Sequence, residues 1–213
     1  MYEGVLRTRH GEDASELAVT MDGIRGNPRE LGGAFSPAAY RAIQQRSHSL
    51  AQFAAWRTDA VLIGEDATRS LALEASCNFF PVYGLTSPLS GRLFRESECA
   101  PGTEERVVVI SEELWRSRFA ADPHILGKTI LLNRQAFTVV GITPANFPGE
   151  LRGSGIWVPY TTQHRLTGNE DIFAADLTPS LWLEGRLRPG RTRGELAAEV
   201  NVIAARVPLS IPP

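Results

Sequence analysis

The feature that most constrains the fold is a run of four consecutive β-branched residues, Val107 to Ile110. Such residues suit a pleated strand, and a run that is apolar on both faces is typical of a strand buried on both sides. A strand of this kind needs neighbouring strands and covering layers above and below. We therefore expect this stretch to form an interior strand of a sheet in a domain that mixes helices and strands.

The residues that follow this strand predict a short helix. Ser111 can cap the free backbone amides, and Glu112 and Glu113 fall in the first turn, where the helix dipole favours negative charge. Trp115 and Phe119 lie four residues apart and so share one face of the helix. We expect that face to cover the sheet.

A hairpin is predicted next, with strands at 129–132 and 136–140. The residues between them must reverse the chain. Asn133 tolerates a positive φ, whereas Arg134 in the left-handed region would cost about 1 kcal/mol. Either Arg134 accepts that strain or the turn is longer than two residues.

Helix signals also flank the central region. Ser36 and Pro37 predict a helix that runs to about Ser47, and Thr192 with Glu195 has the spacing of a capping box for a final helix, whose apolar period continues to Val207. A helical turn is expected at 78–84 and another after Asp122-Pro123. One or two strands are expected within residues 1–33. Further strands are predicted at 50–57, 60–64, 68–74, 156–159 and 181–187.

Composition excludes several classes of function. The chain has 213 residues, of which 43% are hydrophobic and 22% charged, so it can bury a sizeable core. Its net charge of −2 provides no basic surface for nucleic acid or for an anionic membrane. We expect neither a signal peptide nor a membrane-spanning segment in this sequence, and the abrupt end at Pro213 suggests an excised domain.

The two cysteines, Cys77 and Cys99, leave two alternatives open. They could pair in an oxidising compartment, where they would close a modest loop, or remain free thiols. Their spacing fits no metal motif.

Candidate catalytic residues are weak. A hydrolase would use Ser111 as nucleophile, but the surrounding residues lack the glycines of a nucleophile elbow and place two carboxylates beside it. Acidic neighbours such as Glu104-Glu105 and Glu112-Glu113 are not a spaced acid–base pair. We therefore predict no catalytic residue and a chain that is not an enzyme.

The sequence also contains no recognisable motif for binding a cofactor or a metal ion. The segment Gly127-Lys128-Thr129 lacks the upstream glycine of a phosphate-binding loop and leads into a strand. The histidines have no metal-ligand spacing. We predict no cofactor-binding residue and no metal site; the histidines are His10, His48, His124 and His164.

An ordered series of motifs runs through the chain. It comprises Asn78 to Gly84, Gly91 to Phe94, Val107 to Ser111, Leu114-Trp115, Arg118-Phe119, Asp122-Pro123, Leu126 to Ile130, Leu132-Asn133, Phe137 to Ile142, Pro144 and Phe147, with outer matches at Phe35 to Tyr40, Ile156 to Pro159 and Leu187 to Gly190. This series resembles the periplasmic core domain of MacB-type ABC transporter permeases. The resemblance covers nearly the whole chain, although Cys77 stands where the family commonly has glycine, and Arg134 replaces the glycine of an Asn-Gly turn.

The resemblance implies an α+β fold with two subdomains. A porter-like subdomain of βαβ character would combine residues 1–75 and 180–213. A mixed α/β subdomain, residues 76–179, would be inserted between these two segments.

The resemblance also implies a function. The domain would face the periplasm from the bacterial inner membrane and would couple cytoplasmic ATP hydrolysis to the movement or efflux of a substrate. Its partners would be transmembrane helices of the same permease, a second permease protomer and an ABC ATPase subunit, with room for a periplasmic adaptor and with no nucleic acid. The main alternative is a stand-alone periplasmic module that binds a ligand or a lipoprotein.

Overall fold

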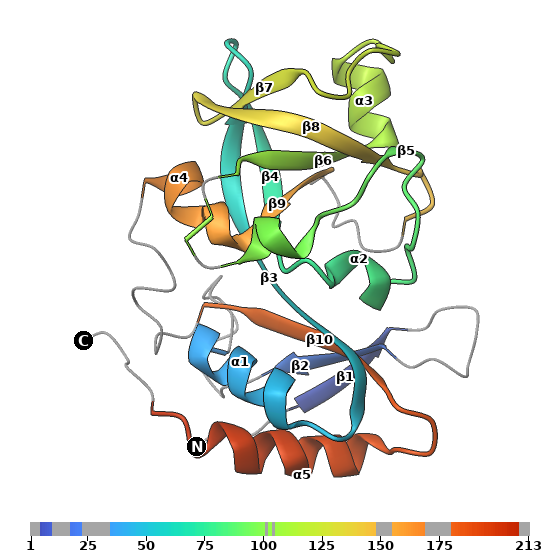
Figure 1. The fold of residues 1–213 in the computed structure, drawn as a ribbon, viewed down its shortest axis with the longest axis vertical. Coiled ribbons are helices and arrows are strands. Elements are labelled where there is room, and N and C mark those ends of the chain that lie inside the picture. The colour runs from blue at the N-terminus through green and yellow to red at the C-terminus, as the bar shows by residue number, and fades with distance from the viewer. Residues whose placement is uncertain are drawn as a thin grey trace. The chain divides into compact units, whose positions relative to one another are not determined.

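The computed structural model describes residues 5–9, 18–22, 35–100, 102–103, 105–147, 155–168 and 180–208. The chain forms two compact units, and the first is discontinuous (Figure 1). Unit 1 comprises Met1–Arg57 and Ile172–Pro213, and unit 2 comprises Thr58–Asp171.

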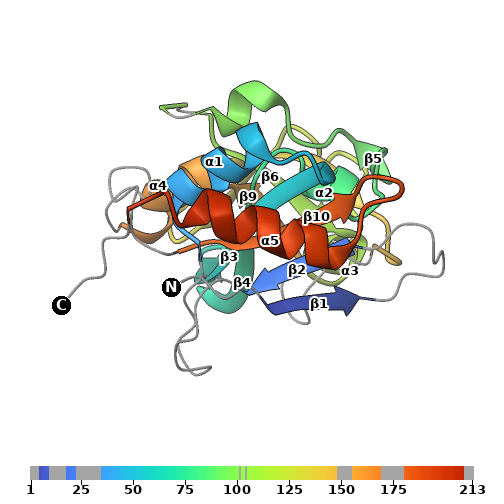
Figure 2. The ribbon, with the colours of Figure 1, turned by 90° about the horizontal axis from the view of Figure 1, so that it is seen from below.

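Unit 1 is an antiparallel sheet with two helices. The strand order is β1-β2-β10-β3, and helices α1 and α5 contact each other (Figure 2). Because β10 pairs antiparallel with both neighbours, β2 and β3 run parallel to each other with α1 between them in sequence. This is a split βαβ arrangement, in agreement with the expected βαβ character. The elements are β1 (Val5–Arg9), β2 (Ala18–Asp22), α1 (Pro37–Arg46), β3 (Leu50–Ile63), β10 (Trp182–Leu187) and α5 (Arg193–Ala204).

Capping explains where the helices of unit 1 begin. The Ser36 hydroxyl accepts a hydrogen bond from the backbone N–H of Ala39, and Thr192 and Glu195 form the predicted capping box. Helix α5 ends at Ala204, so Val207 lies beyond it, contrary to the prediction.

The C-terminal end of α1 is held by a side chain from α5. The Glu199 carboxylate accepts hydrogen bonds from the Ser47 hydroxyl (2.9 Å) and from the backbone N–H groups of His48 (2.6 Å) and Ser49 (3.1 Å). Burial raises the pKa of Glu199, but these hydrogen bonds to its charged form outweigh burial and lower the pKa overall.

Unit 2 is built on a mixed sheet in the order β3-β4-β9-β6-β8-β5, with β7 paired to β8 and to the end of β3. Strand β6 lies between β9 and β8, and all five of its residues are buried, as its β-branched composition predicts. The elements are β4 (Thr68–Ala75), α2 (Phe79–Val82), β5 (Ser90–Gly91), the 3-10 helix η1 (Glu96–Cys99), β6 (Val107–Ser111), α3 (Glu112–Arg118), β7 (Thr129–Leu132), β8 (Gln135–Thr143), β9 (Ile156–Pro159), the 3-10 helix η2 (Tyr160–Thr162) and α4 (Gln163–Thr167).

Each face of this sheet has its own apolar cluster. Alternate residues of β6, Val108 and Ile110, belong to an aliphatic cluster that Trp115 and Phe119 of α3 cover. On β9, Trp157 is fully buried and belongs to an aromatic cluster instead. That cluster consists of Phe79, Phe80, Tyr83, Phe94, Phe147 and Trp157.

Two sequence-based expectations about β3 need correction. Residues 50–57 and 60–64 were expected as separate strands, but they form the single 14-residue strand β3. The strand continues because residues 50–56 pair with β10 and its far end pairs with β4 and β7. The unit boundary therefore falls after Arg57 in the middle of a strand, and not after residue 75 as expected.

The turn between β7 and β8 has only two residues. Asn133 (φ 49°) and Arg134 (φ 63°) are both left-handed, so Arg134 does accept the strain. Asn133 also joins three segments: its side chain accepts from Leu62 N–H and donates to the Leu166 carbonyl, both at 2.8 Å. Its own N–H donates to the Leu62 carbonyl at 2.8 Å.

Arg134→Gly should stabilise the protein by about 1 kcal/mol, because glycine adopts the left-handed conformation without a Cβ penalty. Asn133→Gly is the matched control. It also relaxes the backbone but removes both side-chain hydrogen bonds, so it should destabilise the protein by about 1–3 kcal/mol. Urea unfolding of the two variants measures both effects, and equal shifts in the same direction would contradict this account of the turn.

Glu199→Gln should destabilise the protein in a pH-dependent way. The pKa of Glu199 is lowered by folding, so its contribution is present above the ordinary carboxyl pKa of 4.5 and is lost as the pH falls through the folded value. The difference in unfolding free energy between wild type and Glu199→Gln should therefore shrink below about pH 4.5. Ser47→Ala, which keeps the carboxylate and removes one of its donors, should retain a weaker pH dependence of the same sign.

Candidate functional site

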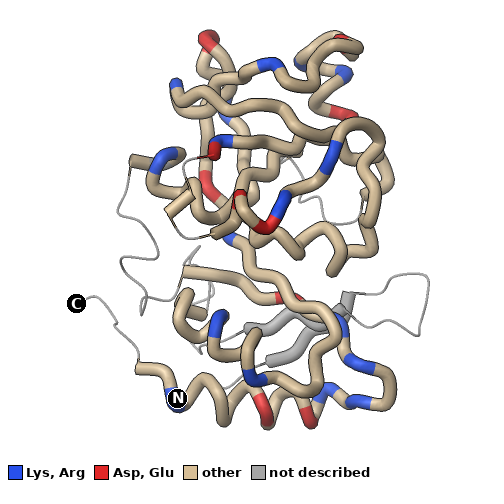
Figure 3. Tube along the Cα trace, in the orientation of Figure 1, with Lys and Arg blue, Asp and Glu red and all other residues tan. Residues whose placement is uncertain are grey.

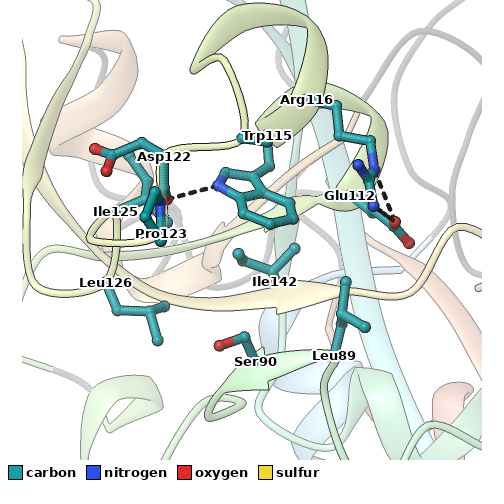
Figure 4. Close-up of a pocket in the computed structure, with 11 residues that line it drawn as sticks. Leu89, Ser90, Glu112, Trp115, Arg116, Asp122, Pro123, Ile125, Leu126 and Ile142 are labelled. Carbon is teal, nitrogen blue, oxygen red and sulfur yellow. Dashed lines mark hydrogen bonds and ion pairs between the residues drawn. The ribbon is translucent and has the colours of Figure 1, made fainter.

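A groove of about 430 Å³, lined by both apolar and charged residues, lies in unit 2 between α3, the loop after it, and β5 (Figure 4). Ile142 of β8 and Ile125 are its buried apolar residues, with 1% and 5% of their surface exposed. Leu89 and Leu126 line the other side and are 48% and 37% exposed. The remaining lining residues are Ser90, Glu112, Trp115, Arg116, Ala121, Asp122 and Pro123.

The indole of Trp115 is fixed in this groove. Its Nε1–H donates to the Asp122 carbonyl at 2.9 Å, and the ring points toward Ile142 in Figure 4. The chain returns across the indole because Ala120 and Ala121 both adopt left-handed conformations, with φ values of 49° and 53°. A tryptophan held at its polar end presents a rigid apolar surface.

Charged side chains stand at opposite ends of the groove and are paired. Arg116 contacts Glu112 at 2.8 Å, and Lys128 contacts Asp122 at 2.6 Å. The hydrogen bond from Arg116 lowers the pKa of Glu112, and the hydrogen bond from Lys128 lowers that of Asp122. Both carboxylates are therefore ionised at neutral pH, and each has a cation beside it.

Two glycines allow β5 to approach β8. Gly91 pairs with Gly141, and a Cβ on Gly141 would lie 2.0 Å from the Arg92 carbonyl oxygen. A Cβ on Gly91 would lie 2.3 Å from the Val140 carbonyl oxygen. Side chains at these two positions would push β5, and the groove wall that it carries, away from the sheet.

A buried ion pair closes the segment that follows β5. The Arg92 guanidinium donates to both oxygens of Glu98, at 2.5 and 3.0 Å, and the Arg95 N–H donates to the same carboxylate at 2.8 Å. Glu98 is fully buried, and its carbonyl accepts from the Thr161 hydroxyl at 2.8 Å. Bidentate pairing with a guanidinium compensates for the loss of hydration of a buried carboxylate.

The cysteines, which the sequence left undecided, form a disulfide. Cys77 and Cys99 have Cα atoms 5.8 Å apart and lie 22 residues apart in sequence. The segment that they enclose carries Leu89, Ser90 and Arg92, so it contains one wall of the groove and the cation of the ion pair.

The residues weighed earlier for catalysis do not assemble into a site. Ser111 is buried and caps α3, where its hydroxyl accepts from the Leu114 N–H at 3.1 Å, as the cap prediction required. Lys128 is held by Asp122. Among the described ranges, no three His, Cys, Asp or Glu side chains are grouped as metal ligands would be. His10 and Glu104 lie outside the described residues.

Sequence reasoning missed the groove, although it placed Trp115 on the covering face of its helix. Leu89, Leu126 and Ile142 are far apart in sequence, and no local pattern joins them. In the part of the chain that the structure covers, no helix has the length and apolar character needed to cross a bilayer.

Comparison with known proteins gives the family. The profile of the MacB-like periplasmic core domain matches residues 4–203. The chain belongs to this family. It is thus a periplasmic domain of the MacB-like ABC transporter permease type.

Less than half of this chain aligns with the curated relatives described here. The macrolide export ATP-binding/permease protein MacB of Neisseria gonorrhoeae is 36% identical over 93 residues, which are 42% of this chain and 14% of that protein. The protein of the same name from Sodalis glossinidius is 37% identical over 100 residues, which are 45% of this chain and 15% of the relative. The chain therefore matches only about a seventh of the length of these relatives.

Solved structures confirm the α+β fold of the MacB-like domain. The periplasmic region of MacB from Actinobacillus actinomycetemcomitans superposes with a TM-score of 0.67 at 14% identity, over 89% of this chain and 82% of that one. The extracellular domain of the ABC-type transporter YknZ from Gram-positive bacteria gives 0.57 at 16% identity, over 78% of each chain. At these identities the likeness concerns the fold alone.

Removing the disulfide should destabilise the domain by about 3 kcal/mol, because the unfolded chain would lose the closure of a loop of this length. The change is the double substitution Cys77→Ser and Cys99→Ser, which leaves no free thiol. Urea unfolding of the variant and of reduced wild type should give the same loss. A variant as stable as the oxidised wild type would show that the disulfide contributes nothing.

Proposed function

We propose that this domain transmits work between the cytoplasmic ATPase and a substrate outside the membrane, without performing chemistry itself. The observation that carries the proposal is the family match over residues 4–203. By analogy with relatives named as macrolide export ATP-binding/permease proteins, the movement would be efflux. The cargo of this chain is left open.

The architecture suits a mechanical role. Transmission between distant sites needs packed elements that move as bodies and segments that link them. Each unit has its own core, and β3 is one unbroken strand that begins in unit 1 and ends in unit 2. A movement applied to one unit would reach the other through this strand.

The polar groups of the described residues support a non-catalytic role. Ser111, the best nucleophile candidate, caps a helix and is 1% exposed. The charged groups at the groove are held in pairs, and Glu98 is held by Arg92. A catalytic acid, base or nucleophile needs access to a substrate, and these groups have structural partners instead.

The disulfide supports the proposed location. Disulfides persist in oxidising compartments such as the bacterial periplasm. We place the domain on the periplasmic side of the inner membrane, joined to transmembrane helices of the same permease. Its other proposed partners are a second permease protomer, an ABC ATPase subunit and a periplasmic adaptor.

One observation favours a second candidate function. The groove has the size of a small-ligand site, which suits a periplasmic domain that captures a ligand, the role weighed above for a stand-alone module. Such a module would bind its ligand without any dependence on ATP hydrolysis.

Coupling predicts that ATP hydrolysis responds to the domain. In the full-length permease with its ATPase, reconstituted in lipid, replacement of residues 1–213 by a short Gly/Ser linker should change the hydrolysis rate about fivefold or more. Arg134→Gly, at an exposed turn, is the control and should leave the rate unchanged. Equal rates with and without the domain would refute coupling and leave ligand capture as the role of the domain.

A further inference from the structure

The groove of unit 2 has the dimensions of a small-molecule site. Its volume of about 430 Å³ falls within the usual range of ligand pockets. A stable protein interface needs about 800 Å² on each partner. Among the described residues near the groove, the large apolar side chains that are strongly exposed are Leu89 and Leu126. This is a small area, so the groove fits a small molecule better than a protein surface.

The walls of the groove are formed before any ligand arrives. Trp115 is tied to the Asp122 carbonyl and packs with the aliphatic core cluster, to which Ile125 and Ile142 belong. The β5 wall is held to β8, and the enclosing segment is closed by the Arg92–Glu98 pair and the disulfide. A preformed apolar site loses little conformational entropy on binding.

The charges at the groove decide the polarity of the occupant. Glu112 is neutralised by Arg116, and Asp122 by Lys128. Figure 3 shows acidic and basic residues interspersed along unit 2. Because each carboxylate has a cation beside it, the two pairs add no net charge to the groove, and an uncharged ligand leaves both pairs as they are. A groove without net charge suits a neutral ligand.

We propose that this groove binds the uncharged apolar part of a small molecule, held between the Trp115 indole and Leu89 and Leu126. The site belongs to unit 2 alone, so the proposal does not depend on the coupling role. The Ser90 side chain, also on the lining, supplies one hydroxyl beside the apolar residues.

The test uses the whole chain and the neutral fluorescent probe N-phenyl-1-naphthylamine. We expect a saturable rise in probe fluorescence with one site per chain, and a dissociation constant that is the same at low and high salt. The anionic probe 1-anilinonaphthalene-8-sulfonate should bind at least about tenfold more weakly, because both cations at the groove are already paired with a carboxylate and its sulfonate would lose water without gaining a free cation.

Substitutions on two walls locate the site. Leu126→Glu and Leu89→Glu each place a carboxylate in the groove and should weaken binding of the neutral probe at least about tenfold. Leu62→Glu is the matched control, because Leu62 is also 37% exposed and lies in unit 2 outside the groove; it should leave binding unchanged. Thermal melting followed by circular dichroism verifies that each variant is folded. If Leu126→Glu does not fold, binding to Leu89→Glu alone tests the site.

Three outcomes would overturn the proposal. The first is fluorescence that rises without saturation, and the second is equal weakening by Leu62→Glu. The third is no binding of the neutral probe to wild type. If Leu126→Glu and Leu89→Glu nevertheless impair the full permease, the groove is assigned to a protein partner.

Discussion

The burial of β6 on both faces is the constraint on which unit 2 depends. Four β-branched residues in succession cannot alternate between core and solvent, so strands must flank them and apolar layers must cover both sides. The flanking strands are β8, which is parallel, and β9, which is antiparallel. A parallel neighbour requires a crossover, and α3 with β7 supplies it. The same helix brings Trp115 to the sheet, so the groove is a consequence of how β6 is buried.

The edge of this sheet depends on a second constraint, which is the close approach of two backbones. Gly141 and Gly91 face each other where any Cβ would meet a carbonyl oxygen at 2.3 Å or less. Strand β5, which these glycines allow next to β8, has only two residues, so its own pairing is too short to be stable. The Arg92–Glu98 pair and the disulfide close the chain on both sides of it. A buried pair of this kind adds little net stability and instead fixes one arrangement, which suits a wall that must stay in place.

Local sequence patterns correctly predicted the features that depend on neighbouring residues, such as helix caps. Ser36, Ser111 and Thr192 were identified as helix caps because each places a hydroxyl before an apolar period, and all three are caps in the structure. The continuity of β3 was missed because it depends on pairing with β10, which lies more than a hundred residues away. The disulfide and the groove depend on the same kind of long-range contact, and neither has a signature within any short window. Arg134 lies between these cases: the sequence posed the two alternatives, and hairpin pairing decided between them.

The discontinuity of unit 1 has a consequence for how the chain folds. Its sheet places β10 between β2 and β3, so the sheet lacks an inner strand until residues 182–187 arrive. Unit 2 is contiguous and has no such requirement. Bringing the two segments of unit 1 together costs the entropy of closing the loop between them, although this cost grows only slowly with loop length. Folding of unit 2 lowers that cost, because one ordered body then replaces a flexible loop of more than a hundred residues. Unit 2 therefore favours the completion of unit 1, and damage to the core of unit 2 would destabilise a sheet to which unit 2 contributes no residue.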